Sequence, residues 1–228
     1  LLLCFVSFVV FDAKAAFDAE LASSLKCVTL FRENEHKHRI PADTLYSISL
    51  NETGKVHSSK KVKLSWPWTV NVEGEGFFFN TKQEAVSFVK KQLSQKKESI
   101  DVGCMQVNLK HHPNAFKSIE EAFEPRANIA YAASFLRSKY DQLGSWHKAI
   151  GHYHSATEAL GTKYKNNVIK IASNIEQYKD TFRQYGRQYS SNKSYNKIVA
   201  RSYNRKLSPV VIDRRYRSNM MVHVPRAS

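Results

Sequence analysis

Apolar side chains return every three or four residues over most of this chain, a spacing that predicts helices with one buried face. In residues 17–36, Leu21 and Leu25 belong to such a stripe. A second helix should begin at Pro41, where a proline costs no hydrogen bond, and stop at Gly54. Further helices are expected near residues 82–97, 125–140 and 146–153, and one last helix should hold residues 164–178.

One region follows a β pattern instead. Residues 66–72 read as a strand, 73–76 as a turn and 77–79 as the returning strand, after a polar and basic loop at residues 55–63. The sequence therefore predicts a mainly α domain that contains a small β-hairpin.

A carboxylate continues the apolar stripe of the second helix. Leu45, Ile48 and Glu52 stand at positions i, i+3 and i+7 and so share one helical face. Apolar neighbours raise the pKa of a carboxyl group, because burial disfavours the anion. Glu52 is therefore a candidate for proton transfer. The alternative is a fraying helix end at which Glu52 simply meets water.

The charge of the chain is positive and unevenly distributed. Lys and Arg number 35 against 20 acidic residues, a net charge of +15, which favours polyanionic partners such as nucleic acid, an anionic membrane or an anionic cell-wall polymer. Residues 181–228 contain eleven Lys or Arg and one acid, Asp213, a net +10. This composition predicts a disordered basic tail that contacts anionic surfaces, following a folded domain over residues 16–180.

The chain starts with an apolar run, Leu1 to Phe11, followed by Ala13-Lys14-Ala15. Residues 1–15 therefore read as a secretory signal peptide without its first residues, with an uncleaved anchor as the alternative. Export leads to an oxidising compartment, in which Cys27 and Cys104 are the two remaining cysteines and candidates for one disulfide. The spacing of histidine and cysteine matches no metal site, and we find no cofactor motif.

The central stretch from Ser99 to Asn108 combines a glycine with apolar and amide side chains. Met105 and Val107 alternate with Gln106 and Asn108. Amides beside apolar groups suit a sugar, which offers hydroxyl and acetamido groups on a weakly apolar ring. Gln106 and Asn108 are thus candidate substrate contacts, and a plain buried turn is the alternative.

Four segments, in order, resemble motifs of the lytic transglycosylase (SLT) branch of the lysozyme-like superfamily. Residues 51–54 resemble its Glu-Ser motif, 103–106 its Gly-Leu-Met-Gln motif, 128–136 its Asn-Ile helix and 149–155 its Ala-Tyr-Asn-Ala-Gly motif. The resemblance implies a lysozyme-like helical fold and a periplasmic enzyme of a Gram-negative envelope. Such an enzyme cleaves the MurNAc-GlcNAc β-1,4 bond of peptidoglycan without a cofactor and leaves 1,6-anhydro-MurNAc ends.

Carried over residue by residue, the resemblance makes Glu52 the single catalytic group. It would protonate the leaving oxygen and then take a proton from the C6 hydroxyl that closes the anhydro ring. Met105 and Gln106 would line the adjoining subsite, and Tyr153 would hydrogen-bond near the glutamate or the sugar. Thr53 replaces the usual serine after the glutamate and keeps a hydroxyl, so a secondary role for it stays open.

Several positions depart from the family pattern. Cys104 replaces leucine, His154 replaces the asparagine after the motif tyrosine, Ser155 stands where alanine is usual and Ala132 where glycine is usual. Asp101 raises a second question, because a carboxylate there could orient water and give a hydrolase, as in goose-type lysozymes. The alternative is an aspartate that caps the turn.

Further alternatives follow from these residues. Trp66 and Trp68 could stack on sugar rings near the cleft or form the core of the hairpin. The protein could be a lysozyme-like hydrolase, or a non-catalytic wall-binding component of a secretion or envelope machine. Binding to nucleic acid depends on the basic tail alone, and export argues against it.

Overall fold

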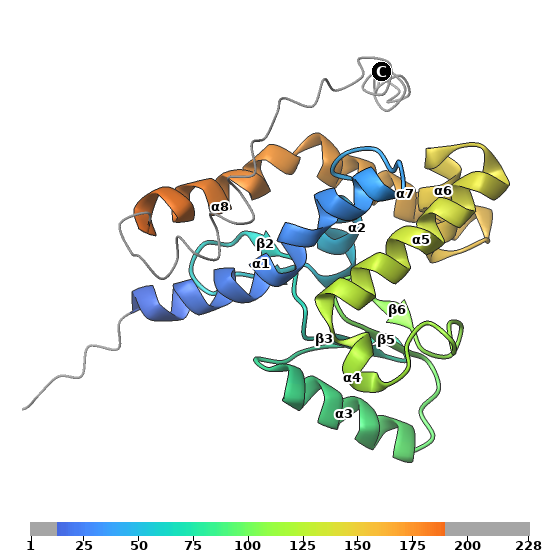
Figure 1. The fold of residues 1–228 in the computed structure, drawn as a ribbon, viewed down its shortest axis with the longest axis horizontal. Helices are drawn as coiled ribbons and strands as arrows, with labels where there is room; N and C mark the ends of the chain where they lie inside the picture. The colour runs from blue at the N-terminus through green and yellow to red at the C-terminus, as the bar shows by residue number, and fades with distance from the viewer. Residues whose placement is uncertain (1–12, 190–228) are drawn as a thin grey trace, which may run out of the picture.

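The computed structural model describes residues 13–189, and residues 1–12 and 190–228 lie outside the description. The helices are α1 (Ala13–Lys37), α2 (Thr44–Thr53), α3 (Lys82–Ser94), α4 (Ile119–Ala122), α5 (Pro125–Leu143), α6 (Trp146–His154), α7 (Glu158–Ser173) and α8 (Ile175–Tyr189). The strands are β1 (Lys55–Val56), β2 (Lys63–Leu64), β3 (Thr69–Val72), β4 (Glu75–Phe78), β5 (Ile100–Val102) and β6 (Val107–Asn108). The mainly α fold with a small β-hairpin is confirmed (Figure 1). The expected signal peptide falls mostly outside the described residues and stays a prediction.

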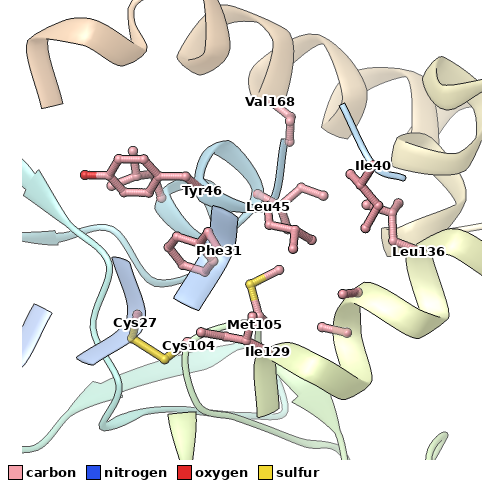
Figure 2. Packing of buried hydrophobic residues seen from close by; sticks show 14 of the residues in the cluster. Cys27, Phe31, Ile40, Leu45, Tyr46, Cys104, Met105, Ile129, Leu136 and Val168 are labelled. Carbon is pink, nitrogen blue, oxygen red and sulfur yellow. A yellow bond between two sulfur atoms is a disulfide. The ribbon is translucent and has the colours of Figure 1, made fainter. Parts of the chain in front are cut away.

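The larger core lies between the helices. α5 packs against α1 and α6, while α7 packs against α2 and α6. The stripe predicted in α2 supplies Leu45 and Ile48, both fully buried. Figure 2 shows Leu45, Phe31 of α1 and Leu136 of α5 around one interior space. Burying each such side chain stabilises the fold by about 1.5–3 kcal/mol. Glu52 thus stands at the end of a helix that is anchored in the core.

The smaller core lies between α3, α4 and a four-stranded antiparallel sheet with the order β4-β3-β5-β6. Figure 1 shows α3 and α4 beside this sheet, at the end of the molecule away from α8. Trp66 and Trp68 are only 2% and 5% exposed within this core. The indole N–H of Trp66 donates to the carbonyl oxygen of Phe79 at 2.8 Å. The tryptophans are therefore core residues, and the interpretation that they stack on a sugar is wrong.

Several boundaries differ from those that the sequence predicted, and three of them have a clear structural cause. Pro41 lies in the turn before α2, which begins at Thr44 after Asp43 adopts a left-handed conformation (φ 67°). The expected loop at 55–63 contains the paired ends of a hairpin, β1 and β2. The single last helix is divided at Asn174, whose side-chain amide donates to the carbonyl of Lys170 at 2.9 Å. Side-chain bonds of this kind compete with helical ones, which accounts for the break.

A buried acid holds the start of α2. Glu35 of α1 is 5% exposed, and its two carboxyl oxygens accept the backbone N–H groups of Asp43 at 3.0 Å and Leu45 at 2.8 Å. These are among the first N–H groups of the helix, which have no partner within it. Burial raises the pKa of Glu35 to about 8. Nothing in the sequence pattern marked Glu35 as a cap for another helix.

The folded part extends beyond residue 181, where the sequence predicted that a disordered tail begins. α8 continues to Tyr189, and Phe182 is buried at 4% exposure in the larger core. Lys179 also pairs with Asp43 at the start of α2, at 2.7 Å. The boundary was wrong because Ile175 and Phe182 continue an apolar face that the many basic residues obscured. The rest of the expected tail, from residue 190, lies outside the described residues.

We expect Phe182→Ala to lower the free energy of unfolding by about 3–5 kcal/mol, because it removes a buried ring from the core. Denaturant unfolding of the variant and its parent measures the loss. Leu160→Ala is the matched control, since Leu160 is 52% exposed on α7 and its truncation should change little. Equal stability of Phe182→Ala and the parent would mean that α8 does not pack as described.

A disulfide joins Cys27 of α1 to Cys104, in the loop between β5 and β6, with a Cα–Cα distance of 6.0 Å (Figure 2). This is the pairing that the sequence predicted.

Between residues 13 and 189, we find no helix with the length and apolar character to span a membrane. Within the same residues, no three side chains of His, Cys, Asp or Glu come together as a group that could hold a metal ion.

Candidate active site

Glu52 opens into a cleft of about 460 Å³ between α2, the sheet and the helices α5 and α6. Its lining is mostly polar and aromatic, with two carboxylates and three histidines among its side chains. The lining residues are Glu52, Asn71, Gly74, Ser99, Asp101, Gln106, Val107, Asn108, His111, His112, Tyr131, Ala132, Phe135, Tyr153 and His154. The structure therefore brings together five of the predicted site residues: Glu52, Asp101, Gln106, Asn108 and Tyr153.

The carboxyl group of Glu52 is partly buried and has one close partner. The hydroxyl of Tyr164, on α7, donates a hydrogen bond to Oε1 of Glu52. Burial raises the pKa of Glu52 to about 7, the Tyr164 hydrogen bond opposes this shift, and the nearby charge of Asp101 adds to it. Glu52 therefore keeps its proton to a higher pH than an ordinary glutamate, whose pKa is about 4.3.

Tyr164 is the functional residue that sequence reasoning missed. The apolar spacing of the last helix marked it as a core residue, and it is indeed only 6% exposed. Its ring also lies parallel to that of His154, with centroids 4.8 Å apart and an angle of 3° between the planes. The available signal was that a buried tyrosine needs a partner for its hydroxyl, which an apolar pattern alone does not identify.

The turn at residues 103–106 is held in place by Asn128 of α5. Its side-chain oxygen accepts the N–H of Met105 at 2.9 Å, and its amide donates to the carbonyls of Val102 at 2.9 Å and Ala122 at 3.0 Å. Gly103 has φ +81°, and a Cβ atom on it would lie 2.5 Å from the Asn128 amide. The Asn128 side chain can therefore hold the turn only because residue 103 is a glycine and leaves room for it.

The turn points the Gln106 side chain into the cleft and the Met105 side chain into the core. Gln106 faces the cleft at φ 46°, and its amide donates to the carbonyls of Thr69 and Gly103, both at 3.1 Å. Met105 is fully buried in the larger core, where Figure 2 shows its side chain, and it is not among the residues that line the cleft. The expectation that the Met105 side chain lines a sugar subsite is therefore wrong. The reason is that successive side chains along the turn point in opposite directions, so that of Met105 enters the core when that of Gln106 faces the cleft.

Asn108 and Asp101 form the far wall of the cleft. The Asn108 amide donates to Oδ1 of Asp101 at 2.8 Å, and its oxygen accepts the N–H groups of Lys110 at 3.0 Å and His111 at 2.9 Å. Burial raises the pKa of Asp101, whereas the Asn108 hydrogen bond lowers it. Asp101 therefore lines the cleft as a second carboxyl group, held by Asn108 of the neighbouring strand β6.

Two other candidates have structural positions. Thr53 is fully buried, with its hydroxyl donating to the carbonyl of Ser49 at 2.9 Å and accepting the N–H of Trp66 at 3.0 Å. It joins α2 to the strand region and does not line the cleft, and a secondary role for it stays a prediction. The hydroxyl of Tyr153 donates to the carbonyl of Met105 at 2.8 Å, which ties α6 to the central turn.

The arrangement is suited to acid–base chemistry on a neutral polar substrate. One carboxyl group whose pKa is raised to about 7 lies in a cleft with amides and aromatic rings. Burial raises the pKa of Tyr153 and of Tyr164 well above the usual value, so both hydroxyls keep their protons as donors. A group with a pKa near the working pH can both give and take a proton efficiently.

Tyr164→Phe is expected to raise the pKa of Glu52 further, because it removes a hydrogen bond that stabilises the carboxylate anion. A ¹³C NMR titration of the glutamate carboxyl groups measures this directly. Tyr140→Phe is the control, since the Tyr140 ring stacks on Trp146 and lines no part of the cleft. An unchanged or lower Glu52 pKa in Tyr164→Phe would contradict the hydrogen bond.

Comparison with known proteins gives one match. Residues 68–176 match the family model described as the transglycosylase SLT domain. This range covers β3 to α7 and includes the central turn, Asn128, Tyr153 and Tyr164. It begins after Glu52, so the role of that residue depends on its own motif and on the geometry of the cleft. No curated protein and no solved structure matches the chain significantly.

Proposed function

Because this chain carries a transglycosylase SLT domain, we propose that it is a lytic transglycosylase that cleaves the MurNAc-GlcNAc β-1,4 bond of peptidoglycan. The domain itself supports a peptidoglycan-acting function of the transglycosylase type. The observation that carries the finer proposal is the state of Glu52, a carboxyl group with a pKa of about 7 in a cleft lined by amides and aromatic rings.

In the proposed reaction, the protonated Glu52 gives its proton to the glycosidic oxygen as the bond between that oxygen and C1 breaks. The resulting carboxylate then takes the proton of the C6 hydroxyl of the same MurNAc. The C6 oxygen bonds to C1, which closes the 1,6-anhydro ring and restores the protonated Glu52. One group acts twice, and no water is consumed. The Tyr164 hydroxyl holds the carboxylate between the two transfers.

Hydrolysis is a second candidate, favoured by one observation. Asp101 lies in the same cleft, and its negative charge contributes to the raised pKa of Glu52. In inverting glycosidases a second carboxylate activates a water molecule on the opposite side of the sugar from the acid. In that case Asp101 would be the base, and the products would carry reducing MurNAc ends.

Mass spectrometry of purified peptidoglycan after incubation with the protein tests both proposals. Anhydro-MurNAc ends are expected from the transglycosylase, and their masses are lower by one water molecule than those of reducing ends. Asp101→Asn should leave anhydro products as the main species under the first proposal and abolish reducing ends under the second. Binding to the wall without new ends of either kind would reject both and favour a non-catalytic wall-binding component.

We also propose that the protein acts outside the cytoplasm, in the periplasm of a Gram-negative envelope. The signal-like residues 1–15 and the disulfide between Cys27 and Cys104 support this location, because disulfides persist in oxidising compartments. We propose a cell-envelope or secretion machine as its partner there. Fractionation of cells into cytoplasm and periplasm, with detection of the protein in each, tests the location.

A further inference from the structure

A second groove, of about 640 Å³, opens beside α1 and shares no lining residue with the cleft around Glu52. Its walls are the middle of α1, the segment before β3 and the first turns of α3 and α5, elements that can be followed in Figure 1. None of the four sequence motifs contributes a residue to it. The chemistry of this groove therefore follows from its own side chains and not from the proposed reaction.

Two helices, α3 and α5, begin at this groove. The capping box of α3 leaves the N–H groups of Lys82 and Gln83 without a partner among the described residues. At α5, the N-cap residue Glu124 makes no side-chain hydrogen bond to the helix. The first N–H groups of a helix have no acceptor within it, and they form the positive end of the helix dipole. Both helix starts therefore favour an anion in the groove.

Cations outnumber acids along the same walls. The charged side chains of the lining are Lys26, Lys82, Arg126 and Glu124. Lys82 pairs with Glu124, and Arg126 pairs with Glu33 at 3.2 Å. Lys26 has no ion-pair partner within residues 13–189. One permanent positive charge in the groove is therefore available to a ligand.

A buried tryptophan supplies a further donor. Trp68 is only 5% exposed, and it lines the groove. Its indole N–H has no hydrogen-bond partner in the described part of the chain, whereas that of Trp66 donates to the carbonyl oxygen of Phe79. A buried indole N–H usually has an acceptor. The ammonium group of Lys26 lies 5.1 Å from the centre of the Trp68 ring, so a negatively charged oxygen fits between these two donors.

We propose that this groove binds a carboxylate of the peptides attached to peptidoglycan strands, as a second site apart from the cleft. The proposal rests on the proposed function for the identity of the polymer, because the SLT domain supports peptidoglycan as the substrate. Carboxylates accept strong hydrogen bonds from N–H groups and pair with ammonium groups. Lys and Arg keep their charge near neutral pH, so the site does not depend on titration there. Such a site retains the protein on the wall between two cleavage events.

The indole N–H of Trp68 reports on the groove directly. The chain has three tryptophans, and their indole signals can be followed in ¹H–¹⁵N spectra of the full-length protein. The ligand is the free wall peptide, released from purified peptidoglycan by an amidase, so that no glycan occupies the cleft. The same peptide with its carboxylates coupled to methylamine is the uncharged comparison. We expect the acidic peptide alone to shift the Trp68 signal in a saturable way, while those of Trp66 and Trp146 stay in place.

A matched pair of variants tests the unpaired charge. Lys26→Met removes the charge and keeps most of the apolar length of the side chain. It should weaken binding of the acidic peptide by about 2- to 5-fold, the usual effect of one exposed charge pair. Lys163→Met is the control, because Lys163 is exposed on α7 and lies outside the groove. The dissociation constants are measured at the Trp68 signal, so binding to Lys and Arg elsewhere in the chain does not contribute to them.

The outcomes separate this proposal from the proposed function. A Trp68 signal that ignores the acidic peptide, or that responds equally to the methylamide, overturns the site. Equal dissociation constants for Lys26→Met and Lys163→Met overturn it as well. A response to inorganic phosphate but not to the peptide rejects the peptide ligand in favour of a phosphate group. Cleavage of peptidoglycan without a Trp68 response leaves the transglycosylase standing without this site, and a peptide response without cleavage leaves the site standing without the enzyme.

Discussion

Glu52→Gln is expected to lower turnover on peptidoglycan by about 100- to 10,000-fold, the usual contribution of a general acid–base group. The amide has nearly the same shape as the carboxyl group, but it can neither give nor take the proton. Release of soluble fragments from purified peptidoglycan, measured over time, checks the loss. Turnover at the parental rate would show that Glu52 is not the acid–base group of the reaction.

Two controls accompany this variant. Glu75→Gln replaces an exposed glutamate on β4 and should keep parental activity. The free energy of unfolding of Glu52→Gln should equal or exceed that of the parent above pH 7, because the pKa of Glu52 is raised by folding. The pKa of Glu52 is raised to about 7 in the folded protein, so its ionisation costs stability as the pH rises from the unfolded pKa through 7. The neutral glutamine does not lose stability in this way. Cooperative thermal melts of the variant and the parent at pH 8 measure the difference.

Loss of the disulfide is expected to lower the free energy of unfolding by about 4.5 kcal/mol, which is the chain-entropy value for its 77-residue separation. The bond stabilises the fold because it restricts the unfolded chain between α1 and the central turn. For a protein of this size the loss corresponds to a melting temperature lower by roughly 10 °C or more. Thermal melts of Cys27→Ala/Cys104→Ala and of the parent measure the difference.

Reductant provides the matched control for the disulfide. The parent should lose most of its added stability in dithiothreitol, whereas the melting temperature of the double variant should not respond. Both cysteines are buried, at 0% and 1% exposure, so the variant also carries a small packing defect that the reduced parent lacks. A double variant as stable as the oxidised parent would show that the bond contributes nothing to the free energy of unfolding.

The amino-acid sequence by itself determined the elements that depend on local patterns. The apolar stripe of α2 placed Leu45, Ile48 and Glu52 on one face, and the structure buries the first two and opens the third to the cleft. The helix expected near residues 82–97 is α3, which begins at a capping box formed by Thr81 and Glu84. These predictions hold because spacing along a helix and the hydrogen bonds of its first turn involve residues only a few positions apart.

The order of the motifs also determined which residues meet in the cleft, although not how each one faces. Gln106 and Asn108 line it as expected, whereas the side chain of Met105, directly before Gln106, points into the core. Sequence alternation indicates that neighbours point apart. Which of the two sides is the core depends on the elements packed behind the turn, here on α5 and its Asn128.

Only the tertiary structure decided the contacts that give Glu52 its chemistry. Tyr164 lies 112 residues further along the chain, and its hydroxyl reaches Glu52 because α7 packs across α2. Glu35 caps α2 from α1, and Phe182 extends the core into a stretch that composition had marked as tail. Local periodicity reports which face of an element is apolar. Burial, and with it the pKa of a carboxyl group and the partner of a hydroxyl, is set by chain segments far apart in sequence.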